Sequence, residues 1–175
     1  MWWRSPALAV VLAAAVAGLG LSGCGFQPLY GSGTTTASGA RLSEAMAAVD
    51  ITPIPGRVGQ KVRNELIFTN TGGNYAPQPR YELKIALTQG EVEQLVQITG
   101  DARGTVLELS ASFTLTDVAN GKVLYQGSTI ARAAFNRYQE IFANVRARYD
   151  AENRAARVVA NSIRTQVAGS LAASR

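Results

Sequence analysis

Two stretches of the chain alternate apolar and polar residues, which is typical of strands with one buried face. The clearer stretch spans residues 107–116, and its apolar positions are Leu107, Leu109, Ala111, Phe113 and Leu115. The other spans residues 81–87, with Gly90 as a bulge or turn before a further extended run at 92–98. Asn120-Gly121 is a strong hairpin signal, so residues 123–135 are predicted to return as the next strand.

A helical repeat of apolar residues follows a short strand candidate at 49–54. Pro53 and Pro55 end that strand, because proline cannot donate to a sheet ladder. Val58, Val62 and Leu66 then recur every four residues and predict one face of a helix that begins near Arg57. The turn residues at 71–74 stop it.

A second helix is predicted at the C-terminus, and its start is ambiguous from the sequence. Its apolar face consists of Ala156, Val159, Ile163, Val167 and Leu171. Extending the helix back to Val145 would place Glu152 on that apolar face, with Arg148 near its edge. A start near Asp150 avoids the conflict, because Asp150 becomes the N-cap and Glu152 lies in the first turn. We therefore expect a loop or broken turn at 136–149.

The predicted order of elements is β-α-β-β-β-α, which indicates an α+β fold. We expect a two-layer sandwich of two helices on one face of a four-stranded mixed sheet. The opposite sheet face carries many Ser, Thr and charged residues. It is therefore either solvated or covered by a polar partner.

The first 24 residues have the pattern of an export signal. Arg4 precedes an uncharged run from Ala7 to Leu21, which at 15 residues falls short of the roughly 20 that span a bilayer as a helix. Leu21-Ser22-Gly23-Cys24 resembles the lipobox of bacterial lipoproteins, which implies cleavage before Cys24 and a covalent N-acyl and S-diacylglycerol lipid on that residue. The alternatives are a retained membrane anchor and an incidental cysteine.

These assignments divide the chain into three parts. Residues 1–23 form a cleaved lipoprotein signal peptide, 24–46 a lipidated tether rich in Gly, Ser and Thr, and 47–175 a single α+β domain. With two or more acyl chains the anchor is durable, so the protein is expected to be attached to a membrane by its lipid.

Composition removes several classes of function. The 175 residues include no His and one Cys, which excludes Ser-His-Asp and Cys-His catalysis and sites built from His or several Cys. We expect no metal, no cofactor beyond the lipid, and no enzymatic activity. The net charge is +5, and residues 131–175 hold eight Arg against three carboxylates. Nucleic acid is not an expected partner, because no basic run is interleaved with aromatic residues and the chain is exported.

Three stretches of the sequence together have a recognisable pattern. They are the opening Cys24-Gly25-Phe26-Gln27-Pro28-Leu29-Tyr30-Gly31, the segment from Val49 to Leu66, and Tyr149-Asp150-Ala151-Glu152-Asn153-Arg154-Ala155-Ala156. These stretches resemble the LptE family of lipopolysaccharide-assembly lipoproteins. The resemblance implies an outer-membrane lipoprotein on the periplasmic side. It further implies that the protein plugs the β-barrel LptD, helps it assemble, and assists the passage of lipopolysaccharide to the outer leaflet.

The same resemblance implies basic residues in loops that contact lipopolysaccharide, whose phosphates suit Arg. On this basis the candidates are Arg103 and Arg148, each of which could instead be an ordinary solvated arginine. Two other classes of function remain open. One is a transport-associated lipoprotein that binds phospholipid or a transporter complex and has an apolar cavity. The other is a periplasmic enzyme that uses Glu91 and Glu93, which lie on one strand face.

Cys24→Ala tests the lipoprotein assignment. We expect this variant to accumulate as an unprocessed precursor without acyl chains, because the thiol that accepts diacylglycerol is gone. The measurement is incorporation of radiolabelled palmitate together with the mass of the protein. Palmitate entering the Cys24→Ala variant would show that the lipobox interpretation is wrong.

Overall fold

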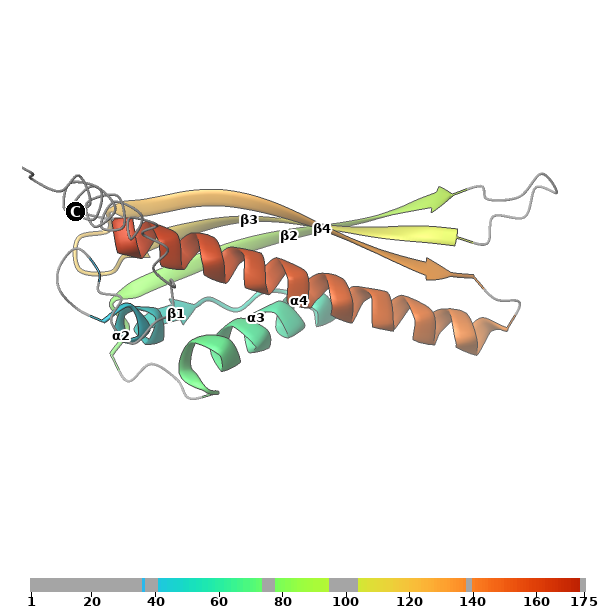
Figure 1. The fold of residues 1–175 in the computed structure, drawn as a ribbon, viewed down its shortest axis with the longest axis horizontal. Helices are drawn as coiled ribbons and strands as arrows, with labels where there is room; N and C mark the ends of the chain where they lie inside the picture. Colours follow the sequence, from blue (N-terminus) through green and yellow to red (C-terminus); the bar gives the residue numbers. More distant parts are fainter. Residues whose placement is uncertain (1–35, 37–40, 74–77, 95–103, 138–139, 174–175) are drawn as a thin grey trace, which may run out of the picture.

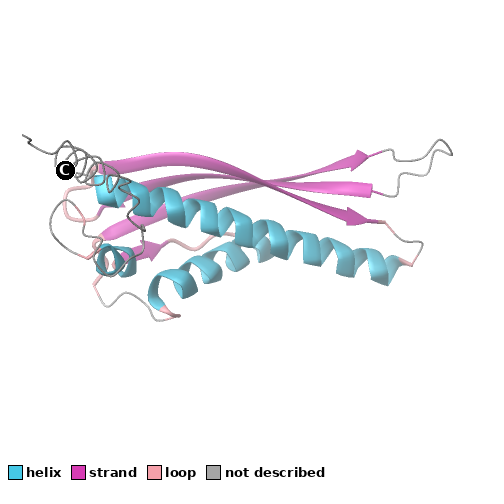
Figure 2. Cartoon of the chain, in the orientation of Figure 1, coloured by secondary structure: helices cyan, strands magenta, loops and turns pink. Residues whose placement is uncertain are grey.

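The fold consists of a four-stranded sheet with helices on one face, as Figures 1 and 2 show. It is taken from a computed structural model that describes residue 36 and residues 41–73, 78–94, 104–137 and 140–173. The elements in chain order are α2 (Leu42–Ala47), β1 (Val49–Ile51), α3 (Gly56–Thr71), β2 (Tyr81–Gln94), β3 (Gly104–Asp117), β4 (Val123–Asn136) and α4 (Ile141–Ala173). The signal peptide at 1–23, Cys24 and Arg103 lie outside the described residues.

The sheet has the order β1-β2-β3-β4, with β1 parallel to β2 and the other two pairs antiparallel. This confirms the predicted α+β class, the mixed four-stranded sheet and the helices that cover one face of it. The prediction of a bulge or turn at Gly90 is wrong. Gly90 pairs with Glu108 within an unbroken β2–β3 register from Tyr81↔Asp117 to Gln94↔Gly104.

The predicted hairpin at Asn120-Gly121 joins β3 to β4. Gly121 adopts a positive φ of 68°, which costs a glycine little because it has no Cβ. The Asn120 Oδ1 accepts from the Lys122 N–H at 2.8 Å, and the Asp117 Oδ1 accepts from the Ala119 N–H at 2.9 Å. These side-chain bonds to nearby backbone hold the turn and set the register of the two strands.

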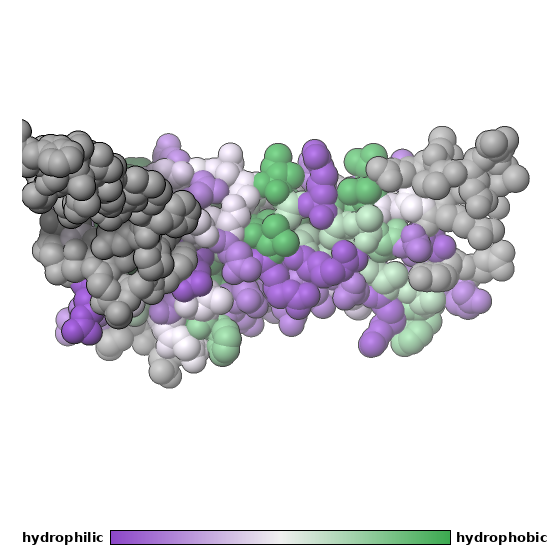
Figure 3. Space-filling view, in the orientation of Figure 1, coloured by the Kyte–Doolittle hydropathy of each residue, from purple (hydrophilic) through white to green (hydrophobic). Residues whose placement is uncertain are grey.

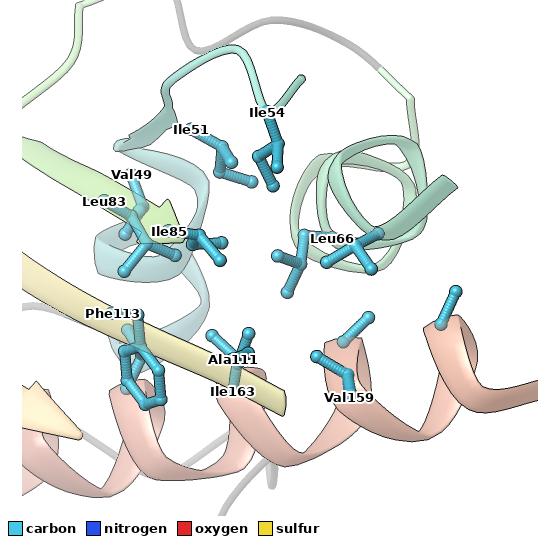
Figure 4. Close-up of a cluster of buried hydrophobic side chains, with 14 of the residues drawn as sticks. Val49, Ile51, Ile54, Leu66, Leu83, Ile85, Ala111, Phe113, Val159 and Ile163 are labelled. Atoms are coloured by element: carbon cyan, nitrogen blue, oxygen red, sulfur yellow. The ribbon is translucent and has the colours of Figure 1, made fainter. Parts of the chain in front are cut away.

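The core lies between the sheet and the helices. In Figure 4, labelled side chains from β1, β2, β3, α3 and α4 point into one shared space, among them Ile51, Leu66, Phe113 and Ile163. The face of α4 toward the core is rich in alanine, which lets the helix approach its neighbours closely. Its buried alanines are Ala151, Ala155, Ala156, Ala160 and Ala168.

The predicted start of the last helix is wrong. α4 begins at Ile141 instead of Asp150 and runs for 33 residues, so the expected loop at 136–149 is mostly helix. Glu152 does lie on the buried face, where neighbouring positive charges hold it, as described below. Asp150 is inside the helix and pairs with Arg154 one turn later at 2.8 Å.

A short helix, α2, lies upstream of residue 47, where the folded domain was predicted to start. It has only six residues, too few for a periodic pattern to be recognised in the sequence. Leu42 and Met46 are nevertheless buried in the same cluster as the strands. The packed part of the chain therefore includes residues from Leu42 onward.

A glycine in α3 allows the chain after β1 to pack against that helix. A Cβ at Gly59 would lie 2.7 Å from Ile54 Cγ2 and 2.8 Å from the Ile54 carbonyl oxygen. Both distances are far below van der Waals contact, and one involves backbone. Ile54 is itself buried, so it has little room to move away. The buried Gly59 is therefore required by this close approach.

We predict that Gly59→Ala destabilises the protein by about 1–3 kcal/mol, the usual cost of overpacking a core. The measurement is the free energy of unfolding from urea denaturation of the non-lipidated protein. Gly169→Ala is the matched control, because Gly169 is also helical but a Cβ there meets no atom within 4 Å. This control should gain about 0.5–1 kcal/mol from helix propensity. Equal effects at the two sites would contradict the packing argument.

Candidate functional site

A cleft opens where α4 extends past the start of α3. Figure 1 shows α3 beside only part of α4, while the first turns of α4 continue toward the tips of the long strands. The cleft has a volume of about 770 Å³ and lies between the beginning of α3, the middle of β2 and the first half of α4. Its lining includes Arg57, Gln89, Glu91, Arg148 and Glu152. We take it as the main candidate site because it gathers these charged groups.

Glu152 is the buried centre of this cleft, with only 7% of its side chain exposed. Its carboxylate pairs with Arg57 from α3 and with the Nε of Arg148 one turn earlier in α4, at 3.2 Å. Gln89 of β2 donates its side-chain N–H to the same carboxylate at 3.2 Å. Three elements thus supply hydrogen-bond donors to one carboxylate, which offsets the cost of removing it from water.

Arg57 joins the beginning of α3 to α4. Its guanidinium carbon lies 4.3 Å from the centroid of the Tyr149 ring, within the range of a cation–π contact. It also donates to the Asn153 Oδ1 at 3.3 Å. Because the planar guanidinium can stack and donate at once, a lysine would not reproduce these contacts.

Arg148, predicted as a contact for lipopolysaccharide, lies at the mouth of the cleft. Its Nε is 3.0 Å from Glu91 Oε1 and 3.2 Å from Glu152 Oε1, so it joins α4 to β2. Half of its side chain remains exposed. Two arginines and two carboxylates, namely Arg57, Arg148, Glu91 and Glu152, therefore compensate one another's charge in the cleft.

A smaller hollow of about 230 Å³ lies next to the cleft at the strand tips. Arg137 pairs there with Glu93 at 2.5 Å. Thr105 is almost fully buried, and its hydroxyl has no hydrogen-bond partner among the described residues. Glu91 and Glu93, the carboxylates of the enzyme alternative, are thus each paired with an arginine.

The sheet face away from the helices is mostly small and polar. We call it the open face. Its cross-strand rows, taken from the register, are Lys84–Thr114–Gln126, Ala86–Ser112–Ser128, Thr88–Ser110–Ile130 and Gly90–Glu108–Arg132. Its small side chains border a hollow of about 590 Å³. Figure 3, in the orientation of Figure 1, shows instead the side of the molecule on which α4 lies, where hydrophilic residues gather over the middle with hydrophobic ones beside them.

The structure thus places one of the predicted site residues in a candidate site. Arg148 is in the cleft, whereas Cys24 and Arg103 fall outside the described residues. The sequence did not identify Glu152 as a site residue, nor Arg57 and Gln89 as the partners of its carboxylate. One signal could have found them, because a carboxylate on the apolar face of a periodic helix needs a buried cation nearby.

No group of three or more His, Cys, Asp or Glu side chains among the described residues is arranged to hold a metal ion. None of the helices that the structure describes is both long and apolar enough to cross a membrane.

The fold is shared with solved structures of bacterial lipoproteins, whereas no protein-family model and no curated protein matches the chain. A lipoprotein from Caulobacter crescentus aligns with a TM-score of 0.65 and 20% identity, over 75% of this chain and 96% of that one. Rare lipoprotein B from Shewanella oneidensis aligns with a TM-score of 0.53 and 12% identity, over 69% of this chain and 93% of that one. Lipoprotein B from Nitrosomonas europaea aligns with a TM-score of 0.54 and 17% identity, over 71% of this chain and 84% of that one.

We predict that Arg57→Met lowers the free energy of unfolding by about 1–3 kcal/mol, because Glu152 then loses a partner while it stays buried. Arg148 and Gln89 still contact the carboxylate, and Arg57 is partly exposed. The loss of stability is therefore smaller than for a buried ion pair whose remaining charge has no other partner. The double variant Arg57→Met with Glu152→Leu should recover part of the loss, as no charge is left unpaired. Urea denaturation of the four proteins in this cycle measures the coupling.

Arg132→Met is the control for that cycle. Arg132 pairs with Glu108 at 2.7 Å on the open face, where its side chain is 68% exposed. Exposed pairs contribute about 0–1 kcal/mol, so this variant should change stability little. A loss at Arg132 as large as that at Arg57 would contradict the role given to burial of Glu152.

Proposed function

We propose that this protein is a non-enzymatic outer-membrane lipoprotein of the LptE family, which three stretches of its sequence resemble. In this role it occupies the lumen of the β-barrel LptD, helps the barrel to assemble, and assists the transport of lipopolysaccharide to the outer leaflet. The lipid on Cys24 holds it to the outer membrane from the periplasmic side. The observation that carries the proposal is the open face of the sheet.

The open face extends along three strands of 14 residues and has no helix over it among the described elements. A solvated face of an antiparallel sheet is polar. This one combines the charged pair Glu108–Arg132 with rows of small side chains such as Ala86–Ser112–Ser128. Small polar side chains let a partner approach closely without burying unpaired charge. The lumen of a transmembrane barrel is polar, so it is chemically matched to such a face.

Lipopolysaccharide contact is assigned in this proposal to Arg103 and Arg148. Arg148 is half exposed at the mouth of the cleft, and its guanidinium has donors beyond the Nε that faces Glu91 and Glu152. A phosphate could therefore bind there bidentately. The residues of the C-terminal third add to this attraction, since most of the excess positive charge lies there.

The alternative is a lipoprotein that binds phospholipid, which requires an apolar cavity for acyl chains. The cleft of about 770 Å³ has two carboxylates and two guanidiniums in its lining. Acyl chains gain little in such surroundings, because these groups would lose their remaining contact with water. The charge of the cleft thus favours the barrel partner over the lipid cavity.

We predict that the full-length lipidated protein, purified from its native outer membrane in mild detergent, brings LptD with it at about one-to-one stoichiometry. Quantitative mass spectrometry of the purified material measures the ratio. Ala86→Arg should reduce the recovered barrel, because a long charged side chain then stands in the middle of the open face. Gln60→Arg is the matched control, since it adds the same charge on an exposed position of α3.

Two results would contradict the proposal. Recovery of the protein alone, or with an inner-membrane transporter, would favour the phospholipid alternative. Equal losses of barrel for Ala86→Arg and Gln60→Arg would show that added charge, and not the open face, controls binding. Lipopolysaccharide binding by the purified complex, compared between wild type and the Arg103→Ala, Arg148→Ala double variant, tests the assigned contacts.

A further inference from the structure

Among the described residues, no strand pairs with β2 on one edge of the sheet over the distal half of β2. β1 has only three residues, and it pairs with β2 only from Tyr81 to Leu83. The last backbone bond on that side is from the Thr52 N–H to the Leu83 carbonyl, at 3.1 Å. Pro53 and Pro55 follow, and neither has an N–H with which to continue the ladder. Beyond Leu83, no described backbone group bonds to this side of β2.

The backbone directions along this edge follow from the bonds that are present. The Tyr81 N–H and the Leu83 carbonyl both point toward β1. Because these directions alternate along a strand, the odd-numbered residues of β2 point away from β3 and the even-numbered ones toward it. Leu87, Gln89, Glu91 and Glu93 therefore present their N–H and C=O groups outward. We call the segment 87–93 the free edge, and all its side chains except that of Leu87 are exposed.

The opposite edge of the sheet is protected. α4 packs along β4, where the Arg154 Nη2 donates to the Ala134 carbonyl at 2.8 Å. Gln166 of the same helix donates its side-chain N–H to the Ser128 carbonyl at 3.5 Å. Both carbonyls belong to even-numbered residues, which in β4 face outward. Within the described fold, side chains of α4 thus bond to backbone groups of one edge, whereas the outward backbone groups of the free edge have no such partner.

The surroundings of the free edge suit an added strand more than a second helix or a small ligand. The edge borders the cleft, so alternate side chains of an added strand would enter it beside Val145 and Tyr149. The other side chains would lie level with Thr88, Gly90 and Val92, and so extend the open face. Seven residues match the usual length of a strand. A side chain can bond to a single edge carbonyl, as at β4, but a row of alternating outward N–H and C=O groups is complemented in full by another extended backbone.

We propose that the free edge of β2 binds an extended segment of the barrel partner by strand addition. The inference rests on the proposed function for the identity of that partner. The partner's added segment would adjoin the part of the same partner that covers the open face. We expect the side chains that the added segment directs into the cleft to be neutral. The reason is that Glu91 and Glu93 of the free edge already pair with Arg148 and Arg137.

The test removes a single outward N–H from the edge. Gln89→Pro and Gln89→Thr both lose the side-chain bond to Glu152, but only the proline lacks the backbone donor. Expressed as full-length lipidated proteins, they are purified from the outer membrane and the recovered LptD is quantified. We expect Gln89→Pro to recover about tenfold less barrel than Gln89→Thr, a change of about 1.4 kcal/mol in binding. Equal recovery with the two variants would overturn strand addition at this edge.

Amide hydrogen exchange supplies a second measurement that does not rely on a variant. In the free protein, the amides of Leu87, Gln89, Glu91 and Glu93 should exchange quickly, while those of the even-numbered residues between them are protected by β3. In the purified complex the odd-numbered amides should become protected as well. Odd-numbered amides that stay unprotected while the barrel is bound would overturn this inference and leave the proposed function standing.

Two other outcomes also decide the matter. Absence of any barrel in the wild-type purification would contradict the proposed function and with it the occupant named here. Odd-numbered amides already protected in the free protein, together with a dimer by light scattering, would show that a second copy of this chain occupies the edge. That result would overturn the assignment to the barrel partner.

Discussion

The fold depends on covering one face of three long strands. Fourteen residues of strand extend over about 46 Å, and a sheet of that length with one apolar face needs a cover of similar length. α4 has 33 residues and so reaches about 50 Å, whereas α3, with 16 residues, covers only part of that distance. The length of α4 is therefore a consequence of the strands. It also explains why the helix continues past residue 150, back to the strand tips.

The difference in length between α3 and α4 creates the cleft, and Glu152 lies where α3 begins. A buried carboxylate there is stable only because Arg57 and Arg148 lie beside it and Gln89 donates to it. The same contacts hold α3, α4 and β2 at a defined spacing, so this ion-pair group fixes the geometry at the inner end of the cleft. Conformational specificity of this kind comes at a cost in stability that an apolar replacement would avoid.

The two surfaces without a cover within the described fold are continuous with each other. The open face carries small polar side chains, and the free edge of β2 lies at its margin. α4 side chains bond to the other edge, at β4. A partner that contacts both surfaces would bury polar groups and also pair the strand backbone, which neither surface offers alone. This asymmetry would give such a partner one orientation relative to the sheet.

The sequence by itself determined the features that depend on neighbours within a few residues. Alternation predicted the strands, Asn120-Gly121 predicted the hairpin, and the four-residue spacing of Val58, Val62 and Leu66 predicted α3. Tertiary structure decided where α4 begins, because the buried charge of Glu152 is stabilised in part by Arg57 and Gln89, which are distant from it in sequence. It also decided that Gly90 pairs regularly and that no strand of the described fold pairs with the distal edge of β2. Those outcomes depend on which segments meet in space, and local periodicity carries no information about that.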